Sequence, residues 1–164
     1  MKRMGAWLAA AALALAATAA LADTPYLRLS FAGRTETLTE AQFAALPHES
    51  VRAFDAHEKT AHVYSGVPVR ALLAPLGVPF GEKLRGRSLR LVVLVRARDG
   101  YAVAYALAEF DPAFSDRTIL LVDRQDGLPL YPGQGPLRIV APGDKRPARW
   151  IRMVTSLDVV GAGG

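Results

Sequence analysis

The sequence contains no cysteine among its 164 residues. The chain therefore forms no disulfide, offers no thiolate to a metal ion and has no cysteine nucleophile. Three classes of protein are excluded on this ground, namely disulfide-stapled secreted modules, thiolate metal sites and thiol enzymes.

Motifs of other common enzyme classes are also missing. No Gly-x-Ser-x-Gly pattern is present, so nothing predicts the nucleophile turn of a serine hydrolase. The stretch PGQGP, residues 132–136, lacks the lysine and the following helix of a phosphate-binding loop. There is no platform of aromatic and basic residues, and the net charge of +5 falls to +3 without Lys2 and Arg3, which carry one positive charge each. We therefore predict no nucleic-acid partner.

A long apolar run occurs only at the N-terminus. Lys2 and Arg3 precede an apolar stretch over residues 6–17, and Ala20-Leu21-Ala22 has the small-x-small pattern of a cleavage site. We predict a signal peptide over residues 1–22, a mature chain with no membrane span after cleavage, and a periplasmic location. An uncleaved anchor is the alternative. The two basic residues are not paired arginines, so the ordinary secretory route is expected rather than the twin-arginine route.

Alternating apolar and polar residues predict many strands. YLRLSFAG and RTETL, residues 26–38, are expected to form a hairpin that turns at Gly33. SLRLVVLVRA is rich in leucine and β-branched residues, and Asp99-Gly100 marks a tight turn into a further strand. Strands are also predicted within residues 51–66 on either side of a polar loop, and over residues 118–124, 137–141 and 149–160.

Helical signals are short. Thr39 and Gln42 have capping-box spacing ahead of a helix that ends before Pro47. Residues 68–77 predict a second helix that stops at its final glycine, and LAEFDP adds a helical turn. Many strands with two or three short helices predict a compact α+β, β-rich domain over residues 23–164.

The polar stretch DAHEKTAH, residues 55–62, carries the first candidate site. His57 and His62 are five residues apart rather than four, so they do not share one helix face as zinc-protease histidines do. On an extended chain Asp55 and His57 share a face, and His57 is predicted to be an acid–base group or ligand. The alternatives are a loop histidine bonded to a carboxylate, and a divalent-metal site at Asp55, His57 and Glu58.

Basic residues gather in GQGPLRIVAPGDKRPARWIRMV, residues 133–154. If the end of this segment is a strand, Arg149 and Arg152 point to opposite faces, so one of them is covered. A covered arginine is suited to bidentate binding of phosphate or carboxylate. The segment therefore predicts an anion site, with a solvated turn beside a charge-protected edge strand as the alternative. The candidate residues are Arg138, Lys145, Arg146, Arg149 and Arg152.

Four stretches, taken together and in order, resemble the molybdopterin-binding domain of the sulfite oxidase family of oxidoreductases. They are YSGVPVRALLAPLGV, DGYAVAYAL, ILLVDRQDGLPL and GPLRIVAPGDKRPARWIRMVTSLDV, and they span residues 64–159. The resemblance implies the family's mixed α+β fold, with a pterin cofactor held in a groove between loops.

The resemblance also implies roles for single residues. Arg149 and Arg152 match basic positions that hold the cofactor, which makes the whole basic segment a candidate cradle. Tyr101 falls where the family has an active-site tyrosine near a bound oxyanion, although by pattern alone a tyrosine after a turn also suits half-buried packing. The family ligates molybdenum through a cysteine whose position corresponds to about Phe54 or Asp55 here, so no metal-ligating residue is carried over.

Two functions remain open from the sequence. The first is a small periplasmic oxidoreductase that uses molybdopterin and transfers an oxygen atom to or from a small oxyanion, with Tyr101 and His57 facing the substrate. The second is a non-catalytic module of the same fold that has lost molybdenum. Such a module would bind a small anionic ligand or a partner protein of the cell envelope.

Overall fold

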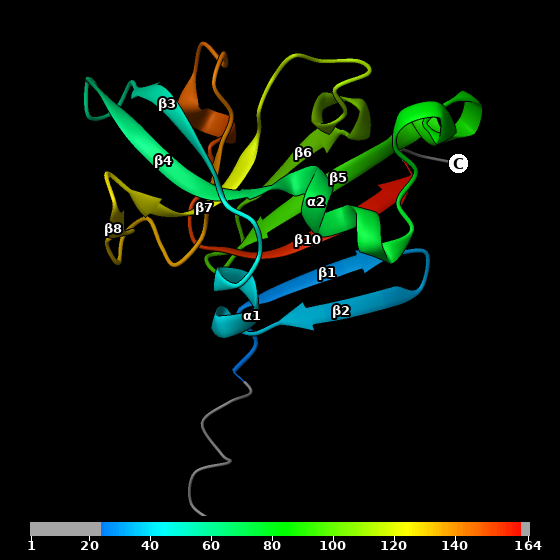
Figure 1. Ribbon diagram of the computed structural model, residues 1–164, viewed down its shortest axis with the longest axis horizontal. Coiled ribbons are helices and arrows are strands. Elements are labelled where there is room, and N and C mark those ends of the chain that lie inside the picture. Colours follow the sequence, from blue (N-terminus) through cyan, green and yellow to red (C-terminus); the bar gives the residue numbers. More distant parts are fainter. Residues whose placement is uncertain (1–23, 162–164) are drawn as a thin grey trace, which may run out of the picture.

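The structure is a computed structural model that describes residues 24–161, so the signal peptide predicted over residues 1–22 lies outside it. Within this range ten strands form two sheets (Figure 1). The first sheet has the strand order β2-β1-β10-β5-β6. Strands β1 and β10 run parallel, and the other neighbours are antiparallel. The strands are β1 (Leu27–Phe31), β2 (Arg34–Leu38), β5 (Leu91–Ala97), β6 (Ala102–Ala106) and β10 (Val154–Gly161).

The second sheet is antiparallel and has the order β3-β4-β7-β8, with β9 also paired to β7. Strand β3 ends this order and pairs with β4 alone. The strands are β3 (Glu49–Asp55), β4 (Thr60–Pro68), β7 (Leu120–Gln125), β8 (Leu128–Pro129) and β9 (Arg138–Val140).

Short helices connect the strands. The predicted capping box is present, because Thr39 accepts a hydrogen bond from the backbone N–H of Gln42 and the Gln42 side chain accepts one in return. Gly77 ends the 3₁₀ turn that continues the second helix and has the left-handed conformation, with φ of +88°. The helices are α1 (Glu40–Ala44) and α2 (Val69–Leu73), and the 3₁₀ turns are η1 (Ala74–Leu76), η2 (Gly81–Lys83), η3 (Gly86–Arg90), η4 (Leu107–Phe110) and η5 (Pro147–Arg149).

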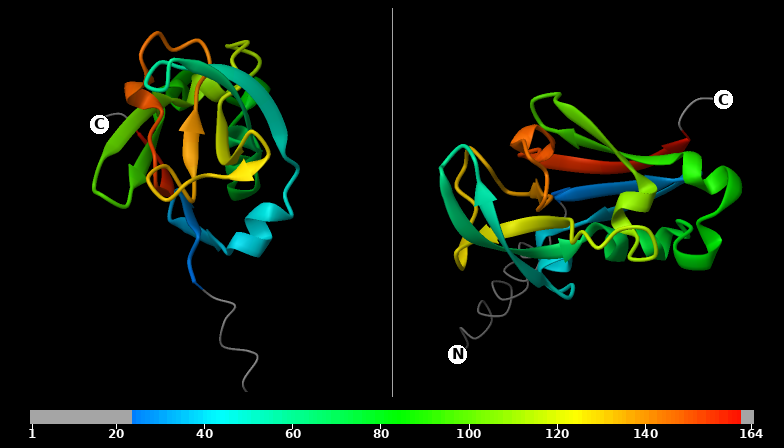
Figure 2. Two further views of the ribbon diagram at one scale, coloured as in Figure 1. Left: turned by 90° about the vertical axis from the view of Figure 1, so that its left-hand side faces the viewer. Right: turned by 90° about the horizontal axis from the view of Figure 1, so that it is seen from above.

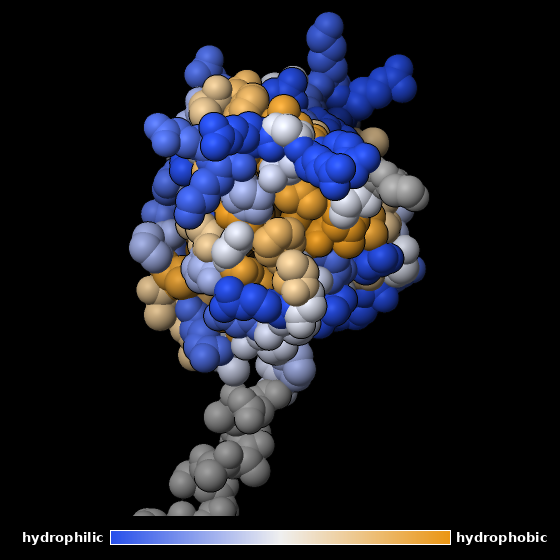
Figure 3. Space-filling view, turned by 90° about the vertical axis from the view of Figure 1, so that its right-hand side faces the viewer, coloured by the Kyte–Doolittle hydropathy of each residue, from blue (hydrophilic) through white to orange (hydrophobic). Residues whose placement is uncertain are grey.

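One apolar core joins the two sheets. Leu27 and Leu29 of β1 are buried and alternate with an exposed residue, as their spacing predicts, and they share the core with Leu121 of β7 and Leu72 of α2. Seen from above, the β3–β4 turn lies at one end of the molecule and η3 at the other (Figure 2). On the right-hand face of Figure 1, apolar side chains gather in the middle with hydrophilic ones around them (Figure 3). No helix between residues 24 and 161 is long and apolar enough to cross a membrane.

The predicted α+β, β-rich fold is confirmed, but the strand predicted over residues 149–160 begins only at Val154. Arg149 ends the turn η5, and Met153 has φ of +53°, which a regular strand does not allow. The reason is that the backbone of this segment bonds outside a regular ladder: the N–H of Met153 donates to the carbonyl of Gln134 in the loop before β9, and the carbonyl of Ile151 accepts from Ile139 of β9. The inference that the two arginines occupy opposite faces of a strand is therefore wrong.

Gly66 allows a close approach of β4 to β7 and supplies a test of the fold. It lies at an irregularity in their pairing, and an added Cβ would lie 2.2 Å from the Leu121 carbonyl oxygen and 2.3 Å from the Val122 Cα. We expect Gly66→Ala to lower the free energy of unfolding by about 3 kcal/mol, because backbone must move to relieve the overlap. Urea denaturation followed by circular dichroism measures this. Gly161→Ala is the control, since nothing lies within 4 Å of its Cβ; equal losses in both variants would contradict the prediction.

Candidate functional site

A concave site surrounds Trp150 at the end of the molecule that carries the β3–β4 turn. Its volume is about 400 Å³, within the range of small-molecule pockets. We call it the Trp150 pocket. It brings together residues from the end of β3, the following turn, β9 and its preceding loop, and the segment around η5. Its lining residues are Asp55, His57, Gln134, Arg138, Arg146, Pro147, Ala148, Trp150 and Arg152.

A buried ion pair forms the floor of this pocket. Nη2 of Arg138 donates to Oδ2 of Asp55 over 2.8 Å, and the side chains are only 4 % and 1 % exposed. The Arg138 guanidinium also lies over the rings of Tyr64 and Trp150, 5.5 Å from each centroid. Burial alone raises the pKa of Asp55, but the hydrogen bond from Arg138 and the backbone N–H groups of His57 and Glu58 outweigh it and lower this pKa. Asp55 is therefore a carboxylate whose two oxygens both accept hydrogen bonds.

Arg138 retains one donor without a partner. Its Nη1 donates to the side-chain oxygen of Gln134 and its Nη2 to Asp55, whereas the buried Nε has no hydrogen-bond partner among the described residues. Buried donors are almost always paired, because an unpaired one costs about 1–3 kcal/mol. An unpaired guanidinium N–H on a residue that lines a pocket indicates a place for an acceptor atom of a ligand.

A chain of polar contacts connects Arg138 to the protein surface. Nε2 of Gln134 donates to Glu58 over 2.9 Å, and Glu58 in turn contacts Nε2 of His62 at 2.8 Å. The other ring nitrogen of His62 lies 2.6 Å from Asp126. The hydrogen bond with Asp126 raises the pKa of His62 against the opposing effect of burial, and the charge of Glu58 raises it further. The two contacts of the His62 ring thus hold the β3–β4 turn against the turn after β7.

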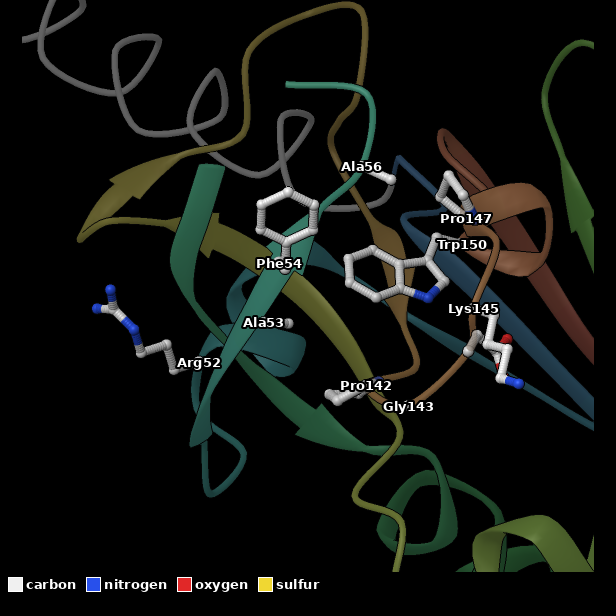
Figure 4. A pocket seen from close by; sticks show the side chains of 10 residues that line it. Arg52, Ala53, Phe54, Ala56, Pro142, Gly143, Lys145, Pro147 and Trp150 are labelled. Atoms are coloured by element: carbon white, nitrogen blue, oxygen red, sulfur yellow. The ribbon is translucent and has the colours of Figure 1, made fainter. Parts of the chain in front are cut away.

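Two of the predicted cradle arginines face the Trp150 pocket with their charges available. Arg146 and Arg152 are exposed, line the pocket and form no ion pair with any residue from 24 to 161. Lys145 lies instead in a neighbouring groove on the other side of Trp150 (Figure 4). Of the five basic residues predicted from the sequence, the structure therefore brings Arg138, Arg146 and Arg152 together.

Arg149 has a different role from the predicted one. Its Nη2 and Nε bind Asp144 at 2.7 and 3.0 Å, and its Nη1 binds both oxygens of Glu109. Its guanidinium also lies 4.5 Å from the ring centroid of Tyr105. The hydrogen bond to Asp144 raises the pKa of Arg149 further above its ordinary value. These contacts neutralise Arg149 and leave it outside the pocket lining, because Asp144 from the preceding turn and Glu109 from η4 both reach it.

The two residues predicted to face a substrate are separated. His57 is exposed and lines the Trp150 pocket, whereas Tyr101 lines an adjoining cavity of about 350 Å³ that shares Ala148, Trp150 and Arg152 with it. The Tyr101 hydroxyl donates to the carbonyl of Ala148 over 3.1 Å. Within residues 24–161 no three His, Asp or Glu side chains converge to hold a metal ion, which argues against the metal-site alternative at Asp55, His57 and Glu58.

Trp150 and Gln134 are the lining residues that sequence reasoning missed. Gln134 is only 2 % exposed although it lies in a glycine-rich loop, and Trp150 is 5 % exposed with its indole N–H donating to Ala141. A tryptophan between two arginines was the available signal, since tryptophan is a frequent partner of guanidinium groups.

Comparison with known proteins gives a fold but no family. No family model matches the sequence, and no curated protein matches it. Among solved structures, the chain is similar to the sulfane dehydrogenase SoxCD from Paracoccus pantotrophus, with a TM-score of 0.62 and 16 % sequence identity. The match covers 82 % of this chain and 38 % of the SoxCD chain, so this protein spans well under half of its length. The α+β fold of this chain is thus similar to that of a solved structure.

The ion pair between Asp55 and Arg138 should contribute to the stability of the folded protein. Arg138→Met leaves the Asp55 carboxylate buried without its cation, so we expect a loss of about 3–5 kcal/mol in the free energy of unfolding. The double variant Asp55→Asn with Arg138→Met removes both charges and should recover part of this loss. Urea denaturation of the three proteins gives the coupling. A double variant less stable than Arg138→Met would contradict the pairing.

The contacts of His62 predict how its contribution to stability depends on pH. The folded pKa of His62 is raised above its ordinary value of 6.5, so its contribution to stability is complete below that pH and is lost as pH rises through the folded pKa. The stability difference between the protein and His62→Gln should therefore shrink as pH increases from 5 to 9. Unfolding in urea at each pH checks this. His57→Gln is the control, and a gap that widens with pH would refute the prediction.

Proposed function

We propose that this protein is a non-catalytic module that binds a small anionic ligand in the Trp150 pocket. The single observation that carries the proposal is the unpaired, buried Nε of Arg138, a residue that lines the pocket. A negatively charged oxygen beside it would complete the hydrogen bonding of the guanidinium, and hydrogen bonds to charged groups are among the stronger ones in proteins.

The charges around the pocket mouth support the same ligand. Arg146 and Arg152 add two positive charges with no described acid beside them, whereas the carboxylate of Asp55 is already fully bonded. Trp150 offers an apolar wall between them. A ligand with one anionic end and a flat or apolar body matches this lining, because pockets combine apolar walls with a few placed polar groups.

Molybdenum does not fit the residues present. The chain has no cysteine, and Asp55, near the position where the sulfite oxidase family has its ligand, accepts four hydrogen bonds from Arg138, Tyr64 and two backbone N–H groups. A carboxylate held in this way would have to give up its cation to bind a metal ion. We therefore derive no step through molybdenum. The pterin remains a candidate ligand only because its phosphate is an anion that the pocket could bind.

The similarity to SoxCD favours a second candidate, a molybdopterin-dependent oxidoreductase acting on a small sulfur compound or oxyanion. It is supported by the fold alone. Elemental analysis of protein purified from its native cells separates the two functions. We expect molybdenum well below one atom per chain, and stoichiometric molybdenum with bound pterin would establish the second candidate instead.

We further propose that the protein acts in the periplasm, where its predicted secretory signal would deliver it. This route threads an unfolded chain, so a ligand would be acquired after export. Mass spectrometry of the N-terminus of the exported protein tests the route. A first residue of Asp23 is expected, and a chain that retains residues 1–22 would contradict cleavage.

Binding can be tested at Arg152, which lines the pocket and forms no ion pair with described residues. We expect Arg152→Ala to weaken binding about tenfold, because one charge-assisted contact is lost, while Arg152→Lys retains most of the affinity. Calorimetric titration with sulfite, inorganic phosphate and a pterin monophosphate gives the dissociation constants. Arg149→Ala is the matched control: its contacts predict lower stability with little change in affinity. Equal loss of affinity in both alanine variants would contradict the assignment of the pocket.

A further inference from the structure

Strand β3 has an unpaired edge. It ends the strand order of the second sheet, and no backbone hydrogen bond from another described residue reaches its outer side. The strand is seven residues long, from Glu49 to Asp55, which is long enough to accept a further strand. Soluble proteins usually shorten or cover such edges, because the free N–H and C=O groups are a template for another chain.

A groove runs along this edge on the side away from the Trp150 pocket. Its volume is about 360 Å³. Phe54 and Ala53 of β3 form one side, and Trp150 and Lys145 form the other (Figure 4). The Phe54 side chain is 61 % exposed, an unusual state for a large aromatic residue in a strand. An apolar side chain from a further strand would cover both rings.

The uncompensated charges beside the groove are positive. Arg52 and Lys145 are exposed and form no ion pair with the residues from 24 to 161. The one acid in the groove lining is Asp144, and Arg149 and Arg117 already bind it at 2.7 and 3.2 Å. The surface that a partner meets is therefore apolar with a basic margin, which selects for acidic residues in the partner.

The same charges disfavour a second copy of this chain as the occupant. An antiparallel pairing of two β3 strands centred on Arg52 would place the two Arg52 side chains opposite each other. It would also place Glu49 of each strand opposite Asp55 of the other. Like charges that face each other across a strand pair are destabilising. The edge therefore favours a partner strand that has an acidic residue opposite Arg52.

From these features we propose that β3 is a docking strand for an extended, acidic segment of a partner protein. The segment adds to the free edge of the second sheet, and its backbone supplies the missing hydrogen bonds. An acidic residue lies opposite Arg52, and a neighbouring apolar residue packs in the groove between Phe54 and Trp150. The groove and the anion pocket share Pro147 and Trp150, but neither Arg52 nor Phe54 lines the anion pocket.

The test uses two synthetic strand peptides of equal length, Ac-TVEVFVT-NH2 and its basic counterpart Ac-TVKVFVT-NH2, in which the charged and the aromatic residue share one face. We expect the acidic peptide to bind at least about tenfold more tightly in calorimetric titration, since only it complements the basic margin. Hydrogen exchange should show new protection of the β3 amides in the complex. Arg52→Glu should reverse the preference between the peptides, and Arg52→Lys should retain it.

Arg87→Glu is the matched charge control, because Arg87 is exposed in η3 and lies outside the groove lining. Equal binding of both peptides, or no binding of the acidic peptide at millimolar concentration, would overturn the proposal. So would an effect of Arg87→Glu as large as that of Arg52→Glu, or protection outside β3 and its groove. Titration of Arg52→Glu with sulfite or inorganic phosphate should match the unaltered protein, which keeps this result independent of the anion pocket.

Discussion

The ion pair between Asp55 and Arg138 is the constraint on which the functional end of this molecule depends. A carboxylate and a guanidinium that are almost fully buried remain charged only when each keeps its partner. The pair therefore fixes the end of β3 against β9, and the donors that complete Asp55 fix the following turn. The rings of Trp150 and Tyr64 pack against each other, and each lies 5.5 Å from the guanidinium. The pocket exists because these elements all meet at one charge pair.

The same pair also decides what the end of β3 can bind. A cysteine thiolate at the end of this strand would present a free metal ligand, whereas a carboxylate at Asp55 is drawn to the nearest buried cation. Once the two are paired, a metal ion would compete with an arginine that has no other acid beside it.

Local chemistry made much of the fold predictable. Alternation in β1 and β5, the capping box at Thr39 and the left-handed Gly77 depend on neighbours in the sequence, and all are present. The site was harder to predict, because the partner of an arginine lies far along the chain. Arg149 and Arg138 looked alike in the sequence, yet Arg149 meets Asp144 and Glu109 of η4, whereas Arg138 is buried with a spare donor. The strand expected around Arg149 failed for a similar reason, since Gln134 and Ile139 of β9 supply the backbone contacts of the residues after it.

Trp150 separates the two cavities and belongs to the walls of both. It is the only tryptophan within residues 24–161, because the other one in the sequence is Trp7. Its indole stacks on a guanidinium and donates its N–H to a backbone carbonyl, so its surroundings are polar on one side and change when either cavity fills. Trp150 is consequently a built-in fluorescent reporter, because its emission would respond to a ligand in the Trp150 pocket and to a strand docked in the groove.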